Sequence, residues 1–399
     1  MELRLLVLSD PHVQGELPDS SSHRESWWAA GEIAKHRDED PVDSMLEMVA
    51  KESVAAQAII VPGDVCHKAS ETGFKVGWER LRLLAYELGN VPLIGTMGNH
   101  DCASKERSSD PFSFARRLPQ FPVRNPSEIE EFWTKGSTIT SIDKAWSVIV
   151  INSAMHHYTE HEARAGTFDA AAILALEQRL QCFKGKVQMA VLHHHPIVHS
   201  NRLADSSEVL PTGDDLLDVL GSNGVKWVIH GHRHEPRFRR GPKHDLVVFA
   251  AGSFSIALRE LSPITRNLLH FVKLELEGDL LRGEVRSWEF NRGYGWSRAS
   301  TKSARIPHVA RFASPRPSLD TLTNAVEAST KAKTPQWLSW KQAVKAHPEL
   351  LNLTPDELDE VTERLRVHRS IQPELDEWGH LHRWTSGDTC VAGRVNDGS

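Results

Sequence analysis

The chain has 399 residues, 40% hydrophobic and 25% charged, which is the length and composition of a soluble globular enzyme. Its formal net charge of −6 provides no general attraction to nucleic acid or anionic membranes, although contact with nucleic acid through a local basic patch stays open. No signal-peptide pattern, membrane-length apolar run or disulfide-framework spacing of the four cysteines is visible. We therefore expect a cytoplasmic protein that does not contact membranes.

Short apolar runs alternate with segments of helical periodicity in the first 96 residues. The runs 3–8, 58–61 and 91–96 have the composition of strands buried on both faces. Between them, 43–56 and 76–88 carry apolar residues at helical spacing. Strand and helix in alternation predict a layered α/β sheet.

The same alternation returns after an irregular stretch and then gives way to strands alone. We expect strands at 147–151, 187–192 and 225–229, helices at 170–180 and 214–220, and antiparallel strands at 246–250, 269–276 and 284–290. These elements predict a two-sheet sandwich flanked by helices.

Composition predicts a main domain at 1–296, a linker at 297–317 rich in Ser, Arg and Pro, and a small, mostly helical region at 318–399. An insertion at about 14–40 contains two adjacent tryptophans, for which packing is the ordinary role. The insertion and the C-terminal region are the two places where we expect an active-site cap, a homodimer contact or a protein-partner contact.

Five polar segments follow predicted strands. Alternate side chains of a strand share a face, and functional groups gather beyond the carboxyl ends of strands in α/β sheets, so we expect them to converge. Taken singly, each also fits an ordinary turn, a solvated loop or a structural histidine. The segments are Asp10-Pro11-His12, Gly63-Asp64, Gly98-Asn99-His100-Asp101, His193-His194-His195-Pro196 and His230-Gly231-His232-Arg233-His234.

This ordered set resembles the calcineurin-like metallophosphoesterase superfamily over about residues 1–290. The resemblance implies an α/β fold, a four-layer α/β/β/α sandwich of two mixed sheets, and a centre of two divalent metal ions. It implies that one ion is held by Asp10, His12, Asp64 and His234, and the second by Asn99, His194 and His232, with Asp64 bridging.

Two further roles follow from the resemblance. Of the three adjacent histidines, His194 is chosen as the ligand because the family's ligand lies two residues before the proline. His100 is expected to be the catalytic acid, oriented by Asp101. The implied reaction is in-line attack on phosphorus by a hydroxide held between the two metal ions, while His100 protonates the departing oxygen.

The ligand chemistry limits the choice of metal. A histidine-rich set disfavours magnesium and calcium, which prefer all-oxygen cages, and favours manganese, iron, cobalt, nickel or zinc, with manganese preferred. The absence of thiolates argues against a structural zinc site. Two divalent ions, two aspartates and a hydroxide leave a charge of about +1, which attracts a phosphate ester.

The resemblance implies a phosphoric ester hydrolase, with a phosphodiester such as a cyclic nucleotide or another nucleotide as the favoured substrate. Residues 165–169 with the helix after them, and the sequence His194-His195-Pro196, are similar to class III cyclic-nucleotide phosphodiesterases. His195 is therefore a candidate for lining the substrate pocket.

Two alternatives stay open. Residues 63–67 resemble the second motif of recombination-repair nucleases, which makes a DNA or RNA nuclease the main alternative, although His67 also fits an ordinary loop. Arg233 begins a basic run that fits either a phosphate contact or a solvated hairpin. A catalytically silent binding scaffold is disfavoured, because every expected ligand is present.

Overall fold

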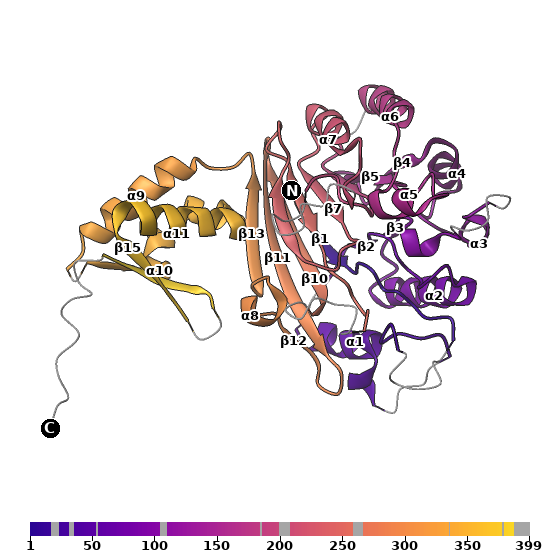
Figure 1. Cartoon of the computed structure of the whole chain (residues 1–399), viewed down its shortest axis with the longest axis horizontal. Coiled ribbons are helices and arrows are strands. Elements are labelled where there is room, and N and C mark those ends of the chain that lie inside the picture. The colour runs from indigo at the N-terminus through magenta and orange to yellow at the C-terminus, as the bar shows by residue number, and fades with distance from the viewer. Residues whose placement is uncertain are drawn as a thin grey trace.

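The computed structural model describes residues 1–16, 24–31, 36–52, 55–103, 110–183, 186–198, 208–257, 266–334, 336–376 and 379–386. Within these residues, the main domain is a sandwich of two mixed sheets with helices on both outer sides (Figure 1). The predicted α/β/β/α architecture is thereby confirmed. No helix in the described part is both long and apolar enough to cross a membrane.

The first sheet has seven strands in the order β12-β11-β10-β1-β2-β3, and β13 pairs with β11 along the same edge as β12. β1 is parallel to β2 and β2 to β3, whereas β10 is antiparallel to β1. The strands are β1 (Glu2–Val7), β2 (Ala58–Val61), β3 (Leu93–Gly95), β10 (Asn267–Glu277), β11 (Leu280–Asn291), β12 (Gly295–Arg298) and β13 (Val309–Ser314).

The second sheet has six strands in the order β4-β5-β6-β7-β9-β8. Its four central strands are parallel, and the two edge strands are antiparallel to their neighbours. The strands are β4 (Ser137–Ser141), β5 (Ser147–Ile151), β6 (Met189–Val191), β7 (Trp227–His230), β8 (Arg237–Arg240) and β9 (Val247–Ala250).

The two faces of β5 enter different hydrophobic cores, because successive strand residues point to opposite sides. Val148 and Val150 pack into the core between the sheets, while Ile149 and Ile151 pack against the outer helices of the second sheet. A strand buried on both faces is therefore apolar at every position, as β5 is.

Helices cover both outer faces of the sandwich (Figure 1). The core beside the first sheet includes buried residues of α1 and α2, and that beside the second includes residues of α6 and α7. The helices are η2 (Arg37–Glu39), α1 (Pro41–Lys51), α2 (Glu71–Glu87), η3 (Asn99–Asp101), α3 (Ser113–Arg116), α4 (Pro126–Lys135), α5 (Glu160–Ala165), α6 (Ala170–Cys182) and α7 (Gly213–Ser222).

The C-terminal unit stands to one side of the main domain, beyond β13 (Figure 1). It has its own hydrophobic core and a three-stranded sheet in the order β14-β16-β15. Its helices and strands, in chain order, are α9 (Leu319–Lys331), β14 (Trp337–Ser339), α10 (Trp340–Ala346), η6 (Pro348–Asn352), α11 (Pro355–Arg369), β15 (Ile371–Leu375) and β16 (Leu381–Ser386).

The segment 297–317, which we expected to be a linker, contains α8 (Thr301–Ala304) and the whole of β13. β13 pairs with β11 over six residue pairs, and its Phe312 is fully buried. The Ser- and Arg-rich composition misled the prediction, because most of these residues lie outside β13, which includes only Arg311 and Ser314 among them. Of the expected insertion at 14–40, only 14–16, 24–31 and 36–40 lie within the described residues.

Candidate metal centre

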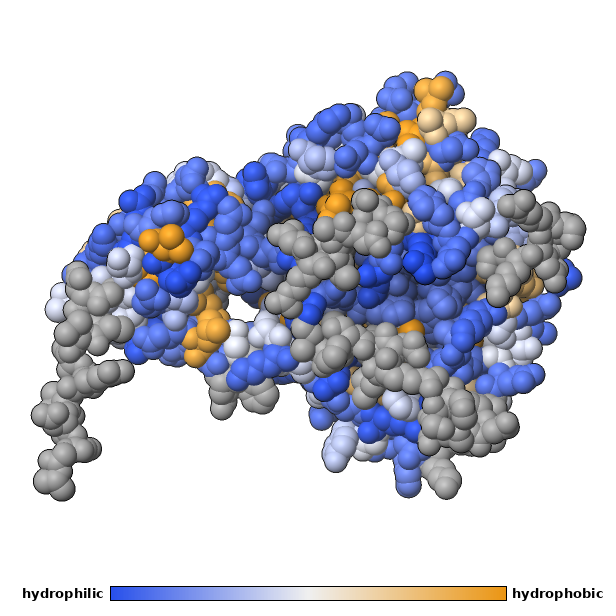
Figure 2. All heavy atoms as spheres, viewed as in Figure 1, coloured by the Kyte–Doolittle hydropathy of each residue, from blue (hydrophilic) through white to orange (hydrophobic). Residues whose placement is uncertain are grey.

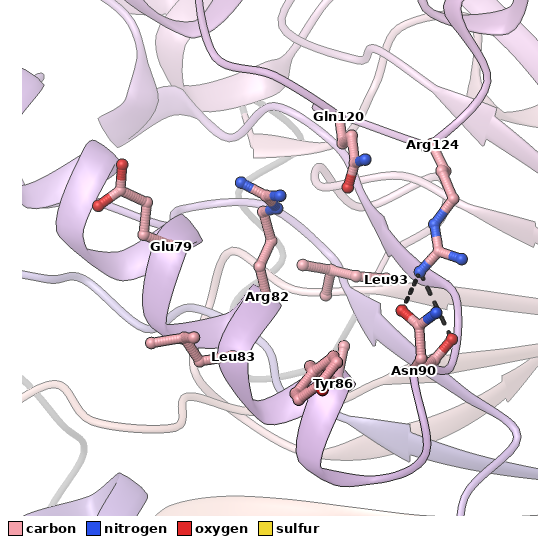
Figure 3. A pocket seen from close by; sticks show the side chains of 9 residues that line it. Glu79, Arg82, Leu83, Tyr86, Asn90, Leu93, Gln120 and Arg124 are labelled. Atoms are coloured by element: carbon pink, nitrogen blue, oxygen red, sulfur yellow. Dashed lines mark hydrogen bonds between the residues drawn. The ribbon is translucent and has the colours of Figure 1, made fainter.

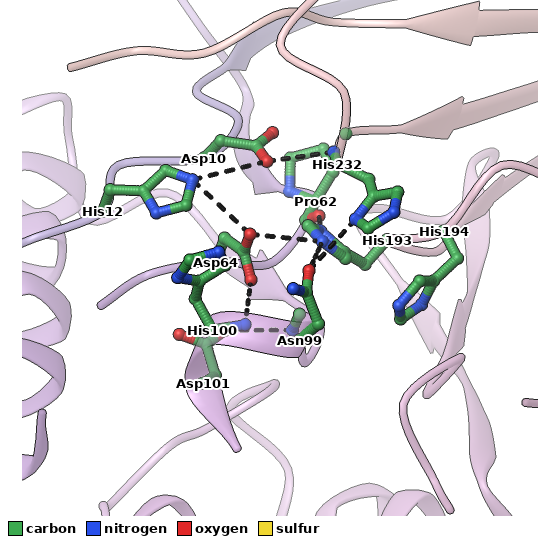
Figure 4. A network of polar contacts seen from close by, with 12 residues as sticks. Asp10, His12, Pro62, Asp64, Asn99, His100, Asp101, His193, His194 and His232 are labelled. Atoms are coloured by element: carbon green, nitrogen blue, oxygen red, sulfur yellow. Dashed lines mark hydrogen bonds and ion pairs between the residues drawn. The ribbon is translucent and has the colours of Figure 1, made fainter. Parts of the chain in front are cut away.

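The polar segments that follow the predicted strands come together at one edge of the sandwich (Figure 4). β1, β2 and β3 lead into the first three segments, and β6 and β7 lead into the two histidine segments. Because the first three strands are mutually parallel, as are the last two, their carboxyl ends lie at common edges. Sheet topology thus brings together side chains that are more than 200 residues apart, such as His12 and His234.

One group consists of Asp10, His12, Asp64 and His234, whose ligand atoms lie within 4.8 Å of one another. His12 Nε2 lies 2.9 Å from His234 Nε2 and 3.5 Å from Asp64 Oδ2. His234 Nε2 is 3.6 Å from Asp10 Oδ1. Imidazole nitrogens and carboxylate oxygens that face one another in this way form a donor set suited to a divalent transition metal.

A second group lies beside the first. His193, His194 and His232 also place their ligand atoms within 4.8 Å of one another. Asn99 Oδ1 lies 3.0 Å from His193 Nε2 and 3.0 Å from His232 Nδ1. His232 Nε2 contacts the Arg164 carbonyl at 2.8 Å, which leaves Nδ1 as the nitrogen that faces the cluster.

Asp64 joins the two groups. Its Oδ2 lies 3.5 Å from His12 Nε2 and 3.3 Å from His193 Nε2. This oxygen is buried and has no hydrogen-bond partner among the described residues. A buried carboxylate oxygen needs a cation to compensate its charge, and the imidazole nitrogens around Asp64 are metal donors, so the site fits metal ions.

The ring of His193 points into the cluster. Its Nδ1 contacts the Pro62 carbonyl at 2.8 Å and therefore carries a proton, while Nε2 faces Asn99 and Asp64. Burial opposes protonation of Nε2, but the neighbouring Asp64 carboxylate raises the pKa of His193 to about 9. In the metal-free chain, a proton on Nε2 thus faces the oxygens that a metal ion would contact.

The ring of His194 has different surroundings. Its Nδ1 lies 2.9 Å from Ser153 Oγ, and its Nε2 lies 3.3 Å from the Ala163 carbonyl. Both nitrogens are thus engaged by neutral polar groups of the protein. No sequence motif marks Ser153, yet this residue follows β5 by two positions, and its Oγ also accepts the backbone N–H of His193 and of His194.

Backbone conformation sets the site apart from its surroundings. Positive φ is uncommon for residues other than glycine and is held only where the surrounding structure enforces it, frequently at functional sites. A Cβ atom at Gly98 or Gly231 would overlap the carboxylate of Asp64 or Asp10, so both positions need glycine. The expected ligands with positive φ are Asp10 (50°), His12 (49°), Asp64 (49°), His232 (83°) and His234 (56°).

Burial controls the charge of the ligands. Burial and the nearby Asp64 charge raise the pKa of Asp10 to about 7, against the opposing charge of His193. Burial also favours the neutral, protonated form of Asp64. The positive charges of His193 and His100 have the larger effect and hold the Asp64 pKa well below its usual value. Burial lowers the pKa of His234 to about 3, so its imidazole is neutral and able to bind metal.

His100 lies at the edge of the first group. Its backbone N–H donates to Asp64 Oδ1 at 2.7 Å, and its ring stacks on His67 with centroids 4.9 Å apart. The Lys68 backbone N–H reaches His100 Nδ1 at 3.4 Å. This contact makes Nδ1 an acceptor, so the proton of the neutral ring is on Nε2.

Asp101 has a different role from the one we expected. Its Oδ1 accepts from the Cys66 N–H at 2.8 Å and its Oδ2 accepts from the Gly98 N–H at 3.0 Å. Burial raises the pKa of this carboxyl to about 7. Asp101 therefore ties the loop after β2 to the loop after β3, and it contacts these backbones rather than the His100 ring.

The three candidate substrate contacts are placed differently. His67 lies in the site, where its Nδ1 is 3.3 Å from His12 Nδ1. His195 is 2% exposed, and its ring packs edge-on against the His230 ring with centroids 4.5 Å apart. Arg233 forms an ion pair with Glu208.

The basic run beyond Arg233 faces the C-terminal unit. Arg237 and Arg239 pair with Asp356 at 3.1 and 3.0 Å, and Arg240 Nε lies 2.9 Å from Glu357 Oε1. These arginines therefore join the two units, and their charge is compensated by α11.

A separate hollow of about 590 Å³ lies beside α2 (Figure 3). Arg82, Tyr86, Asn90 and Arg124 are among its lining residues, and Arg124 Nη2 donates to Asn90 Oδ1 at 3.0 Å. It contains none of the candidate ligands. Figure 2 shows that the face in view is largely hydrophilic, with hydrophobic side chains in small groups.

Comparison with known proteins agrees with this chemistry. A sequence model of the family described as calcineurin-like phosphoesterase matches residues 3–236. A search of curated proteins finds no match.

Solved structures with a similar arrangement have low sequence identity to this chain. A Staphylococcus aureus protein described as a putative 5′-nucleotidase is 14% identical, with a TM-score of 0.38. The match covers 69% of this chain but 51% of the nucleotidase, so the chain spans about half the length of that protein. The Plasmodium protein GAP50 is 14% identical over 74% of this chain and 88% of its own, with a TM-score of 0.39. Vps29 of Entamoeba histolytica, solved with zinc, is 12% identical over 74% of this chain and 98% of its own, with a TM-score of 0.30.

Proposed function

Because the chain belongs to the calcineurin-like phosphoesterase family, we propose that it hydrolyses a phosphodiester, with a nucleotide or cyclic nucleotide as the favoured substrate class. The observation that supports this most directly is the position of Asp64, whose Oδ2 lies 3.5 Å from His12 Nε2 in one group and 3.3 Å from His193 Nε2 in the other. A carboxylate placed between two imidazole-rich groups suits a pair of metal ions.

Two divalent ions fit the donor set. Bound here, they would supply an activated water molecule and neutralise the charge that builds up on the phosphate. Their identity remains a proposal, with manganese preferred over iron, zinc, cobalt and nickel. The first ion would be held by Asp10, His12 and His234, the second by Asn99, His193 and His232, with Asp64 shared.

This assignment takes His193 in place of His194. His193 presents Nε2 to Asn99 and Asp64 and holds its other nitrogen against a backbone carbonyl, as metal-binding histidines usually do. His194 instead uses both nitrogens to hold Ser153 and the Ala163 carbonyl. In this proposal, the His194 side chain fixes the loop that presents its neighbour.

His100 is proposed to protonate the leaving oxygen. As an imidazolium, the ring would give one proton to the departing oxygen and become neutral, and stacking on His67 fixes its plane. Its backbone N–H also holds the Asp64 carboxylate at 2.7 Å, so the proposed acid and the shared ligand are positioned by the same turn. Proton donation to an alkoxide is what a phosphodiester with a poor leaving group requires.

Charge favours a small substrate over a polynucleotide. Residues 318–386 contain eight Lys and Arg against eleven Asp and Glu, a net charge of −3. The arginines of β8 are paired with α11, so they are not a free phosphate-binding surface. Nucleic-acid binding depends on positively charged surfaces that can contact phosphates. A nuclease is therefore the second candidate, because neither the C-terminal unit nor β8 provides such a surface.

The test is a hydrolysis screen of the full chain with manganese. The substrates are cyclic nucleotides, linear dinucleotides, single-stranded and duplex DNA, and phosphomonoesters. We expect the small diesters to be cleaved and the activity to disappear in Asp64→Asn. Full activity without metal would overturn the mechanism, and full metal loading with no hydrolysis of any substrate would favour a binding scaffold.

A further inference from the structure

Glu25 reaches the candidate metal centre through His67. Glu25 Oε2 lies 2.8 Å from His67 Nε2, and His67 Nδ1 lies 3.3 Å from His12 Nδ1. The remaining nitrogen of His12, Nε2, faces His234 at 2.9 Å and Asp64 at 3.5 Å. A carboxylate, an imidazole and a ligand imidazole thus form one continuous line into the first group.

The segment that presents Glu25 is fixed by backbone hydrogen bonds. The Glu25 carbonyl accepts from the Ala257 N–H at 2.7 Å, and the Trp27 N–H donates to the Ser255 carbonyl at 2.7 Å. Trp28, next along the chain, is 1% exposed and packs against Phe254. The insertion therefore holds Glu25 at a defined position beside the site.

We propose that Glu25 and His67 form an outer relay that orients the metal ligand His12. With His12 and His67 both neutral and Glu25 ionised, one placement of protons satisfies the contacts. The Glu25 carboxylate then lies at ion-pair distance from the protonated Nε2 of His67, His67 Nδ1 accepts the proton of His12 Nδ1, and the lone pair of His12 Nε2 faces the site. This placement fixes both the tautomer and the plane of the ligand ring.

Burial of the two histidines makes the contacts between their nitrogens important for the orientation of His12. His12 is fully buried and His67 is 8% exposed, so water is largely excluded as a substitute partner for their nitrogens. A carboxylate behind a metal-binding imidazole increases its basicity, and loss of such outer partners typically weakens metal binding about 10- to 100-fold. Glu25 is in this sense a positioning residue, which acts on the metal site only through His67.

The relay rests on the proposed function, since it requires a metal ion at His12. The experiment is a calorimetric titration of the metal-free full chain with Mn²⁺, which reports a Kd for each site without any activity measurement. We expect Glu25→Gln to weaken one of the two sites about 10- to 100-fold and leave the other unchanged. His67→Phe should have the same effect, because it breaks the line while keeping the Glu25 charge.

The double variant separates a relay from a simple effect of charge. In a relay, Glu25→Gln adds no further loss to His67→Phe, whereas independent effects add. Lys68→Met is the matched control, because Lys68 Nζ contacts Glu25 at 2.5 Å but lies outside the line. It should bind Mn²⁺ at least as tightly as the wild type, since it removes a positive charge near the site.

Each outcome has a distinct meaning. Unchanged Mn²⁺ affinity in both single variants, or losses that add in the double variant, would overturn the relay while leaving two metal sites in the wild type. A wild-type chain that binds no Mn²⁺ would instead refute the proposed function. Thermal unfolding of the metal-free variants checks folding, and His67→Phe tests the same link if Glu25→Gln is unstable.

Discussion

His193 Nε2 lies 3.0 Å from Asn99 Oδ1, although 94 residues separate the two side chains. Asn99 belongs to the loop after β3 in the first sheet, and His193 follows β6 in the second. The contact therefore crosses from one sheet to the other, so the proposed second metal would be held by both halves of the sandwich.

Substitution of the adjacent histidines distinguishes their roles. His193→Ala should reduce bound metal from about two ions to about one per chain, because its Nε2 faces Asn99 and Asp64. His194→Ala should keep both ions but lower the free energy of unfolding by about 1–3 kcal/mol, because Ser153 Oγ and the Ala163 carbonyl lose a partner. Elemental analysis and denaturant unfolding measure the two effects, and the reverse pattern would restore His194 as the ligand.

Asp64→Asn should weaken both metal sites together, since one carboxylate oxygen contacts both groups. An amide removes the negative charge but retains the size of the side chain, so the fold should persist. Metal content after dialysis against limiting Mn²⁺ measures the change. Asp10→Asn is a matched comparison that should weaken one site more than the other, because Asp10 Oδ1 faces the ring nitrogens of His12 and His234, whereas it meets His232 of the second group through the backbone N–H.

His100→Ala should impair substrates according to their leaving group. A nitrophenolate departs without a proton, but an alkoxide needs one, so the loss on a cyclic nucleotide should exceed that on bis-nitrophenyl phosphate by about 10²- to 10⁴-fold. Steady-state kinetics on both substrates measure the difference. Equal losses on both with metals retained would assign His100 to binding or to the attacking side.

The position at which the chain is shortened should decide whether the main domain folds. A chain that ends at Pro317 keeps β13 and should fold and bind metal, whereas one that ends at Ser303 loses this strand. Removing the buried Phe312 alone would be expected to cost about 3–5 kcal/mol. Thermal unfolding compares the two proteins, and equal stability would show that β13 contributes little.

Acid should destabilise the metal-free chain through His270. Burial lowers the pKa of this histidine to about 4, from an ordinary value near 6.5. The folded chain then binds fewer protons than the unfolded chain between these values, so stability is lost as pH falls from about 6.5 to about 4. This difference of 2.5 pKa units should lower the free energy of unfolding by about 3 kcal/mol at pH 4 and below.

His270→Asn should flatten this part of the stability profile. The neutral ring in the wild type donates Nε2–H to the Ala251 carbonyl and accepts from Ser287 Oγ at Nδ1, a pattern that protonation breaks. Denaturant unfolding at several pH values in the presence of chelator gives the slope. A variant with the wild-type slope would show that other groups cause the acid sensitivity.

Much of the fold followed from local sequence patterns. The runs 58–61 and 147–151 are strands with the predicted bounds, because continuous apolar residues require burial on both faces. The prediction was wrong at 297–317, where the short apolar strand β13 lies within a segment that is otherwise rich in Ser and Arg. Its pairing with β11 is a long-range contact that composition does not record.

The sequence alone determined which side chains gather beyond the strand ends, because strand alternation and the parallel order of the sheets place them there. Which nitrogen of each imidazole faces the cluster depends instead on contacts between segments that are distant in the chain. His193 and His194 are adjacent and chemically identical, and the Pro62 and Ala163 carbonyls that distinguish them come from other parts of the chain. Glu25 likewise becomes a neighbour of His67 only because backbone hydrogen bonds hold the insertion against residues 255–257.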